Sequence, residues 1–561
     1  MQHWLLLIFL ASLALLNPWV RGDGVGYYAF ARAPLIQHNL DFTNDYISAN
    51  SSFRGGRLGE NGLPKADFRT PTGHLDNHFT VGPAILWSPF LLIAHAGVLL
   101  AGAFGASVAA DGFSAPYRVA MALGTALYGF LGLWIAFRLA AKYVEERWAF
   151  LATIAIWWAS SLPIYMYFNP SWSHAHSAFC VALFVWYWHR TREHRSTLQW
   201  IVLGAISGLM LNVYYVNAMV LMILVVEALR QYFAAFRRST PPAAKIPSAP
   251  APAAVAMSAE AQAVRAAEIP APSAGDATSR DDRAIASAAG ATAAVNLATP
   301  TADYGNAVGA SPKADHATQA ARSSVPQLLL QHFLYCVTLL ICLLPTFITR
   351  RIVYGGSLES GYIPLRNWLW RSPVFLSVLF SSNHGLLAWT PILFFAVAGL
   401  ILFRWQHRSV GTPLLAAVIA FYILIACYPD WAGISSYGNR FFVSLTPFFI
   451  FGLAVFLQRI AIVLAHASHY FRQPQWRVNV FVSVLLAAFI AWNVGLMFQW
   501  GTHLVPARGE ISWSTMIHNQ FSAVPEQISS HLRNYLFRRK AMMQQIENGD
   551  VEYLKKNPPP P

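Results

Sequence analysis

The chain opens on Trp4-Leu5-Leu6-Leu7-Ile8-Phe9-Leu10, and the apolar run continues to Trp19 before it reaches Arg21-Gly22-Asp23-Gly24-Val25-Gly26-Tyr27-Tyr28. This run is long enough to cross a bilayer when the helix is lightly tilted. An acidic residue where a helix leaves the membrane is costly unless it has a function. A long polar stretch rich in Asp, His, Asn and Arg follows it. The pattern predicts a membrane protein with chemistry at one membrane surface.

The composition is that of a membrane protein. Of the 561 residues, 56% are hydrophobic and 11% are charged, whereas soluble domains are about 45–50% apolar and about 25% charged. The net charge is +14, but Lys and Arg gather in short clusters between apolar segments, as the positive-inside bias predicts. No basic groove or RNA-binding motif accompanies them, which argues against nucleic-acid binding. The predicted fold class is an all-α polytopic membrane protein.

The four cysteines indicate neither a metal site nor a disulfide framework. None forms a CxxC pair, and all lie inside apolar segments, where cysteine behaves as a small core residue. They are Cys180, Cys336, Cys342 and Cys427.

The first apolar run differs from a cleaved secretory signal. It lacks a basic segment at its start, and no clear small-x-small cleavage motif precedes the polar stretch. We therefore expect a retained transmembrane helix, whose short cytoplasmic end is consistent with a start clipped upstream.

The positions of basic clusters predict the topology. If Val81–Phe104 crossed the bilayer, the clusters at 142–147 and 190–195 would share a side with the polar first loop, against the positive-inside rule. We therefore expect Val81–Phe104 to lie in the interface or to be re-entrant. The short loop Asn169–His174 then joins the first loop on the outer face.

Further spans bring the expected total to about eleven. Leu198–Phe233 is too long for one straight helix, and Asn212–Asn217 divides it into two short spans with a tight outer turn. The other expected spans lie near Arg118–Ala141, Leu328–Ile348, Leu386–Phe403, Pro413–Cys427, Phe441–Leu457 and Val478–Gln499.

Composition also divides the chain into regions. Residues 1–238 form an N-terminal transmembrane module whose first loop, about 20–117, carries the candidate chemistry. Residues 239–326 are rich in Ala, Pro and Ser and predict a disordered cytoplasmic linker, with a regulatory docking segment as the alternative. Residues 327–500 form the C-terminal transmembrane helices, and the tail 501–561 is expected on the outer side.

Motif searches exclude several classes of enzyme. The sequence contains no GxSxG nucleophile motif, no HExxH, no P-loop and no GxGxxG. A membrane enzyme without a nucleotide site, but with outward acids and arginines, suits a donor that arrives already attached to lipid. The first helix exit offers Asp23, which could act as general base on an acceptor or hold a divalent cation. The alternative is an acid that is merely solvated at a helix end.

The neighbours of Asp23 favour a site. Gly22, Gly24 and Gly26 let the backbone approach a ligand closely. Tyr27 offers an interface anchor or a surface on which a sugar can stack.

Other side chains expected on the outer face are candidates for a binding or metal site, and most of them also have a non-functional explanation. His74, Asp76 and His78 could begin a metal site or form a solvated loop. Arg440 at the outer start of a span can pair with phosphate or snorkel to the headgroups. His174 and His384 are similarly placed, and Arg350 and Arg351 could bind an anionic lipid headgroup; a histidine satisfied at a helix end is the alternative for His174.

These features resemble the GT-C glycosyltransferases, a class that includes protein O-mannosyltransferases and aminoarabinose transferases. The shared features are a first helix, an outward acid in Gly22–Tyr28, and a long first loop that ends in a juxtamembrane segment, here Val81–Pro89. An arginine at the start of the next span follows, here Arg118 in Pro116-Tyr117-Arg118. The resemblance covers residues 1–235 well and the rest in general layout.

The resemblance implies roles for particular residues. Asp23 would activate the acceptor, while Arg118 and Arg440 would lie near the phosphate of a polyprenyl-phosphate sugar donor. Many members carry a second acid in the loop between the third and fourth spans, but Asn169–His174 contains none. Two residues are candidates for the role of that missing acid: His174 in the same loop, and Asp76 in the first loop.

The expected function is transfer of a sugar from a polyprenyl-phosphate donor to an acceptor on a glycan, lipid or protein, outside a bacterial inner membrane. A divalent metal ion is a candidate cofactor. The runner-up is a transporter or flippase for a lipid-linked or anionic solute, which would need polar residues near the midplane of its spans. A structural membrane protein is the third alternative. The sequence has no internal repeat, which disfavours the transporter.

Overall fold

The computed structural model describes residues 1–239, 324–359, 361–470, 475–507 and 509–556. These residues form helices and connecting loops without any β-strand; the pairs Leu58–Pro64 and Arg69–Leu75 are isolated bridges. Most of the expected linker, residues 240–323, lies outside the described residues.

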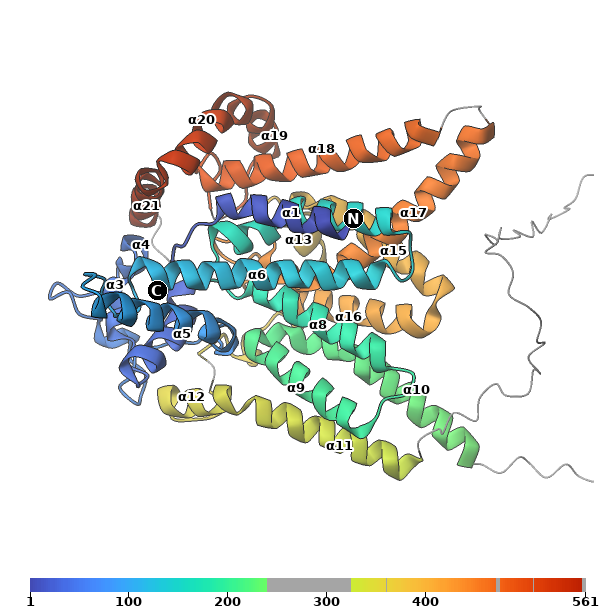
Figure 1. Cartoon of the computed structure of the whole chain (residues 1–561), viewed down its shortest axis with the longest axis horizontal. Coiled ribbons are helices and arrows are strands. Elements are labelled where there is room, and N and C mark those ends of the chain that lie inside the picture. The colour runs from blue at the N-terminus through green and yellow to red at the C-terminus, as the bar shows by residue number, and fades with distance from the viewer. Residues whose placement is uncertain (240–323, 360, 471–474, 508, 557–561) are drawn as a thin grey trace, which may run out of the picture. The chain divides into compact units, whose positions relative to one another are not determined.

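Figure 1 labels the helices of the described chain. In chain order they are α1 Gln2–Ser12, α2 Asp23–Arg32, α3 Thr43–Ser48, α4 Ser51–Arg54, α5 Gly82–Ala103, α6 Ala115–Ala140, α7 Glu146–Trp158, α8 His174–Thr191, α9 Thr197–Val213, α10 Met222–Ser239, α11 Val325–Cys342, α12 Leu344–Tyr354, α13 Phe375–Phe380, α14 Leu386–Trp389, α15 Ile392–Gln406, α16 Arg408–Cys427, α17 Thr446–Tyr470, α18 Gln475–Gly501, α19 Trp513–Phe521, α20 Ala523–Phe537 and α21 Arg539–Lys556.

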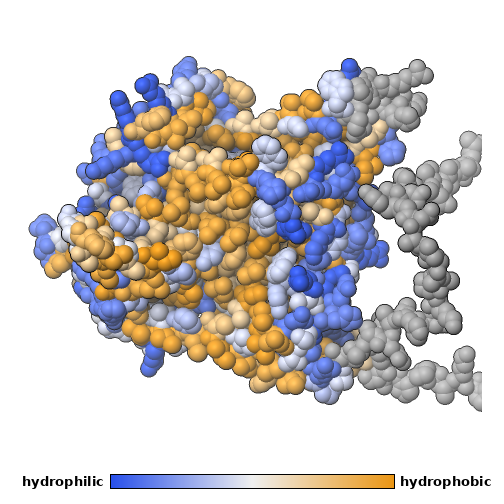
Figure 2. Space-filling view, viewed as in Figure 1, coloured by the Kyte–Doolittle hydropathy of each residue, from blue (hydrophilic) through white to orange (hydrophobic). Residues whose placement is uncertain are grey.

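Seven helical segments in the described part of the chain are long and apolar enough to cross a membrane, so the chain is a multi-pass membrane protein. Three shorter apolar helices accompany them: Gln2–Leu15, Thr197–Val213 and Ile392–Gln406. The count of about eleven spans stays a prediction. Figure 2 shows a broad hydrophobic band across the helices on one face, with hydrophilic residues on both sides of it.

The break expected in the segment Leu198–Phe233 is present. Helix α9 ends at Val213, a 3-10 turn runs over Tyr215–Leu221, and α10 begins at Met222. The side chain of Asn217 donates hydrogen bonds to Ser177 Oγ at 2.9 Å and to Met210 O at 3.1 Å. The polar residues in the break are therefore used to hold neighbouring helices.

Two other expected spans are interrupted. The segment Leu328–Ile348 is divided where α11 ends at Cys342 and α12 begins at Leu344. The segment Leu386–Phe403 is divided between α14 and α15 at Thr390-Pro391. Both second helices begin with proline close by, at Pro345 and Pro391, because proline lacks the N–H that would continue the preceding helix.

Hydrogen bonds hold the segments on both flanks of α5. Thr80, just before it, donates to Val213 O at 2.8 Å. Beyond its end, Gly112 O accepts a hydrogen bond from Tyr28 in α2 at 2.7 Å. The helix has the length of a span, and the segments on its two flanks contact the end of α9 and helix α2.

The basic clusters come together at the opposite end of the bundle. Tyr143 contacts His189 at 2.5 Å, and its ring lies 5.3 Å from that of His407. Arg192 and Arg230 reach the first turn of α16 through hydrogen bonds to Ser409 at 3.4 and 3.0 Å. Loops distant in sequence thus form one basic end, as the positive-inside bias requires of a cytoplasmic face.

Candidate active site

Asp23 forms an ion pair with Arg440, 417 residues away in the chain. Arg440 Nη1 lies 2.5 Å from Asp23 Oδ2, and the side chains are 14% and 32% exposed, respectively. A charge-assisted hydrogen bond of this length orients both groups. The pair is therefore partly buried, and the carboxylate is the more exposed partner.

Local backbone geometry sets the direction of Asp23. Gly22 has φ +54°, a conformation that disfavours residues with a side chain. Gly24 N and Val25 N then donate to Arg21 O and Gly22 O, both at 3.0 Å, and form the first turn of α2. Asp23 is thereby the first residue of the helix, where the positive end of the helix dipole favours a carboxylate.

Aromatic side chains surround the guanidinium of Arg440. It lies 4.9 Å from the centre of the Trp172 ring, and Trp172 Nε1 donates to Arg21 O at 3.1 Å. Arg440 Nε is buried and has no hydrogen-bond partner among the described residues. This nitrogen is therefore an unsatisfied donor within the described part of the chain.

Tyr27 and His174 lie beside the pair. Ser173 Oγ donates to the Tyr27 hydroxyl at 3.0 Å, and burial raises the pKa of Tyr27 above its ordinary value. The His174 ring is 3% exposed and lies 4.6 Å from that of Tyr165. Its Nδ1 has no partner among the described residues. Both residues belong to the environment of Arg440, which acts on each of them electrostatically.

A second acid, Asp76, lies in the first loop. The Tyr354 hydroxyl donates to its Oδ1, and His78 Nδ1 lies 3.5 Å from its Oδ2. Burial raises the pKa of Asp76, but these hydrogen bonds and the nearby charges of His78 and Arg350 outweigh burial and lower it. The carboxylate is thus kept ionised and suits a base or a charged contact.

The two acids belong to one region of the first loop. Arg57 acts electrostatically on both Asp23 and Asp76, and its guanidinium lies 4.4 Å from the Phe53 ring. Asn77, beside Asp76, donates to Gly26 O at 2.9 Å. A Cβ on Gly26 would lie 2.2 Å from the Phe79 ring. The glycine is required because the loop packs directly against α2.

We predict that Asp76→Asn changes how the free energy of unfolding depends on pH. Because the folded pKa is lowered, the contribution of the carboxylate is present at neutral pH and is lost as pH falls through the folded pKa. Since Asp76 is 39% exposed, we expect the variant to lose only about 1 kcal/mol of unfolding free energy at pH 7. Unfolding in detergent should show the difference from wild type shrinking below about pH 4. A difference that is constant from pH 7 to 3 would contradict the assignment.

The other predicted residues lie in different surroundings. Arg118 lines a hollow of about 150 Å³ with Trp19, Tyr28 and Asp45, and Asp23 is not among its lining residues. His384 is fully buried and stacks on Trp389, with ring centres 4.9 Å apart. Burial, together with a smaller effect of the Arg440 charge, lowers the pKa of His384 to about 4, so this ring is neutral near pH 7.

His74 and the two arginines of α12 have structural contacts. His74 Nδ1 lies 3.0 Å from Thr72 Oγ1, and no hydrogen bond or ion pair joins it to Asp76. Arg350 donates to His78 O at 2.6 Å and to Tyr215 OH at 3.0 Å. Arg351 donates to Gly355 O at 2.6 Å. The geometry thus gives Arg350 a role in holding the loop segment that carries His78.

The described residues contain no group of three or more His, Cys, Asp or Glu side chains arranged to hold a metal ion. Asp76 and His78 supply two donors, and Asp23 is engaged by Arg440. These described residues therefore do not form a ready set of metal ligands.

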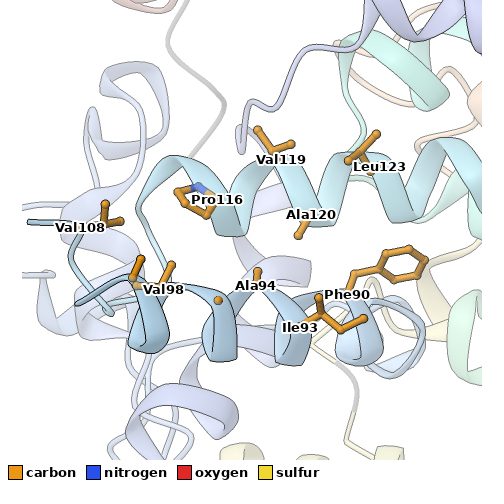
Figure 3. Close-up of a pocket in the computed structure, with 11 residues that line it drawn as sticks. Phe90, Ile93, Ala94, Val98, Val108, Pro116, Val119, Ala120 and Leu123 are labelled. Carbon is orange, nitrogen blue, oxygen red and sulfur yellow. The ribbon is translucent and has the colours of Figure 1, made fainter. Parts of the chain in front are cut away.

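An apolar hollow of about 410 Å³ lies between α5 and α6 (Figure 3). All its lining residues are apolar, among them Phe90, Ile93, Val119 and Leu123. It can hold hydrocarbon but offers no group for catalysis.

Some residues of the site were not predicted to belong to it. Trp172 lies in the loop Asn169–His174, which the sequence singled out only for its lack of an acid. Arg57 was one of many charged residues in the first loop, and Tyr354 had no local signal. Only the folded chain brings their side chains to the two carboxylates.

Residues 113–247 match the family model described as dolichyl-phosphate-mannose-protein mannosyltransferase. No curated protein matches the sequence. The apo oligosaccharyltransferase from Archaeoglobus fulgidus is structurally similar, with 13% identity and a TM-score of 0.42; the alignment covers 91% of this chain and 57% of that chain. The chain thus spans little more than half the length of that relative.

The family match confirms the resemblance to GT-C glycosyltransferases for the matched segment, which holds α6 to α10. His174 and Arg118 lie within it, whereas Asp23, Asp76 and Arg440 lie outside it. The chain is therefore similar to membrane glycosyltransferases, and the roles of its outer acids rest on the geometry.

Proposed function

We propose that the protein transfers a sugar from a polyprenyl-phosphate donor to a hydroxyl of a glycan, lipid or protein acceptor at the outer face of a bacterial plasma membrane. The family match over 113–247 supports the glycosyltransferase class. The observation that carries the proposal is the Asp23–Arg440 pair, partly exposed and surrounded by aromatic rings.

The pair has the two groups that the reaction needs. A carboxylate can take the proton of the acceptor hydroxyl. A guanidinium can stabilise the phosphate that leaves, because its fork matches two phosphate oxygens. In the resting protein each group satisfies the other, so neither charge is left unpaired before substrates arrive.

Donor binding would separate the two functions. When the donor phosphate engages Arg440, its hold on Asp23 weakens and the carboxylate is released toward the acceptor. Asp23 then accepts the proton, the acceptor oxygen bonds to the anomeric carbon, and the bond from that carbon to phosphate oxygen breaks. The bonding electrons leave with the phosphate, where Arg440 offsets the charge. A single displacement of this kind inverts the configuration.

Asp76 is the proposed second carboxylate. It is held ionised by Tyr354 and His78 and shares the electrostatic influence of Arg57 with Asp23. This geometry supports a role in orienting the sugar or the acceptor. We place the prenyl chain of the donor in the apolar hollow between α5 and α6, whose lining suits hydrocarbon.

The contacts of the acidic residue within the apolar segments argue against a transporter. Glu227, an acid inside the apolar segment Leu198–Phe233, is paired with Arg195 at 3.0 Å and also accepts from Trp188 Nε1. It therefore stabilises the basic end of the helices and is not a free site for an ion or solute.

The proposal is tested by measuring release of the lipid product, free polyprenyl phosphate. We expect the purified protein in vesicles, given a panel of polyprenyl-phosphate sugars and candidate acceptors, to release free polyprenyl phosphate from at least one donor. Vesicles without protein give the background. Movement of a donor across the bilayer without release from any donor would contradict the transferase and favour the transporter.

A further inference from the structure

The C-terminal helices return to the chain segment that leads to Asp23. The Tyr535 hydroxyl donates to Leu15 O at 2.7 Å, and Arg539 donates to Ala14 O at 2.7 Å and to Leu16 O. The last carbonyls of a helix have no partners within it. The tail therefore caps the end of the first helical segment, Gln2–Leu15.

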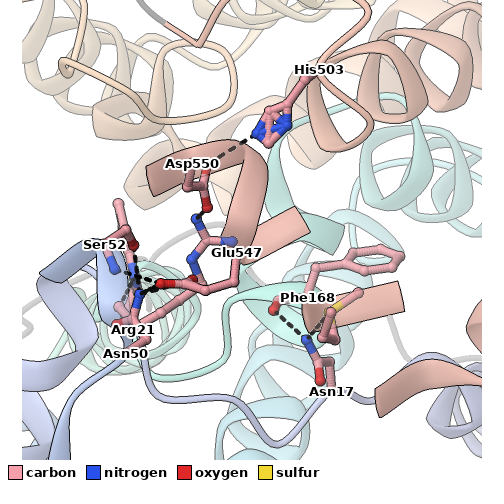
Figure 4. Close-up of polar contacts among 10 residues, drawn as sticks. Asn17, Arg21, Asn50, Ser52, Phe168, His503, Glu547 and Asp550 are labelled. Carbon is pink, nitrogen blue, oxygen red and sulfur yellow. Dashed lines mark hydrogen bonds and ion pairs between the residues drawn. The ribbon is translucent and has the colours of Figure 1, made fainter. Parts of the chain in front are cut away.

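Two carboxylates of α21 hold the outer segments on either side of Asp23 (Figure 4). Asp550 lies 2.5 Å from Arg21 Nη2 and 2.9 Å from His503 Nε2. Glu547, only 5% exposed, accepts from Asn50 Nδ2 at 3.0 Å and from Ser52 N at 2.5 Å. One helix thus binds both the approach to α2 and the start of α4.

The bond to Arg21 bears directly on the direction of Asp23. Arg21 O accepts the first backbone hydrogen bond of α2, from Gly24 N at 3.0 Å, and also accepts from Trp172 Nε1 at 3.1 Å. The Arg21 backbone is therefore held from the bundle side, while its side chain is held by Asp550 from the tail. Residues 16–21 form no helix; Asn17 N donates to Tyr167 O at 2.8 Å, and the contacts of Arg21 hold the other end of this segment.

We propose that Asp550, assisted by Glu547, is a positioning residue that sets the orientation of the Asp23 carboxylate for proton transfer. This inference rests on the proposed function of Asp23. The tail touches neither Asp23 nor Arg440 through any hydrogen bond or ion pair in the described chain, so it acts through Arg21. A misplacement near 1 Å at a reacting group can cost about 100-fold in rate.

Asp550→Ala tests the inference in full-length protein in lipid nanodiscs. We expect kcat to fall about 10- to 100-fold with little change in KM for the donor, since the phosphate is bound by Arg440 on a different element. Asp550→Glu should recover part of kcat because it keeps a carboxylate for Arg21. The matched control is Glu552→Ala on the same helix, an exposed acid without an ion pair in the described residues.

A double-variant cycle separates positioning from general loosening. If Asp550 acts through Arg21, Arg21→Ala and Asp550→Ala should each lower kcat, and the double variant should be no worse than the stronger single variant. Additive losses, or an equal loss in Glu552→Ala, would overturn the inference. So would wild-type kcat in Asp550→Ala.

Hydrogen exchange gives a readout that does not depend on turnover. We expect faster exchange over residues 16–28 in Asp550→Ala than in wild type and Glu552→Ala. Unchanged exchange there overturns the positioning role, whatever the activity. If the wild type uses no donor while exchange responds as expected, the proposed transferase fails and the anchoring of the Asp23 segment stands.

Discussion

Asp23→Asn is expected to lower turnover about 10²- to 10⁴-fold, the usual contribution of a general base. The amide keeps the size of the carboxylate and can still accept a hydrogen bond from Arg440, but it cannot take up a proton at neutral pH. KM for the donor should change little, because the phosphate contact belongs to Arg440. Initial rates of polyprenyl-phosphate release, with unfolding temperature measured on the same sample, check the prediction.

Asp67→Asn is the matched control for this variant. It makes the same chemical change in the same loop, at an exposed acid for which the described chain shows no hydrogen bond or ion pair. Its turnover should equal that of wild type. Wild-type turnover in folded Asp23→Asn would remove the proposed base.

Arg440→Leu is expected to lower kcat about 10²- to 10³-fold, as loss of one preorganised donor to developing negative charge does. It should also raise KM for the donor and weaken inhibition by free polyprenyl phosphate. Leaving Asp23 unpaired costs stability as well, but less than for a fully buried pair because its carboxylate is 32% exposed. Steady-state kinetics with product inhibition measure both constants.

Arg440→Lys refines this prediction. Lysine keeps the positive charge but loses the planar fork that binds two oxygens, so it should restore stability more fully than kcat. Arg366→Leu, at an exposed arginine, is the control for loss of a positive charge on the outer segments. Unchanged product inhibition in Arg440→Leu would contradict a phosphate-binding role.

The helical membrane fold could be predicted from local sequence signals. Hydropathy and charge alone are enough to recognise long apolar runs and the placement of Lys and Arg. The break at Asn212–Asn217 was predicted for the same reason, because polar residues interrupt an apolar run there. The interruptions at Leu343 and Thr390 were not predicted, because only Pro345 and Pro391 mark them within otherwise apolar runs. Short helices such as α13 were missed as well, since six residues give no clear period.

The sequence indicated which outer residues could act but not which would meet. Asp23 and Arg440 were each recognisable as charges at a membrane exit, yet their pairing depends on how α2 and the turn before α17 pack. Arg118 looked equally suitable from its position and lies in a separate hollow. The contact of Asp550 with Arg21 had no local signal, because a surface acid in a polar helix ordinarily remains solvated.

The central claim is that the Asp23–Arg440 pair is catalytic and does not merely hold two segments together. The exchanged variant Asp23→Arg with Arg440→Asp tests it most directly, with unfolding temperature and polyprenyl-phosphate release measured on one sample. We predict that the exchange restores much of the stability lost in either single variant while turnover stays at the background level, because base and phosphate ligand have traded places. Turnover near the wild-type rate in the exchanged protein would contradict the account.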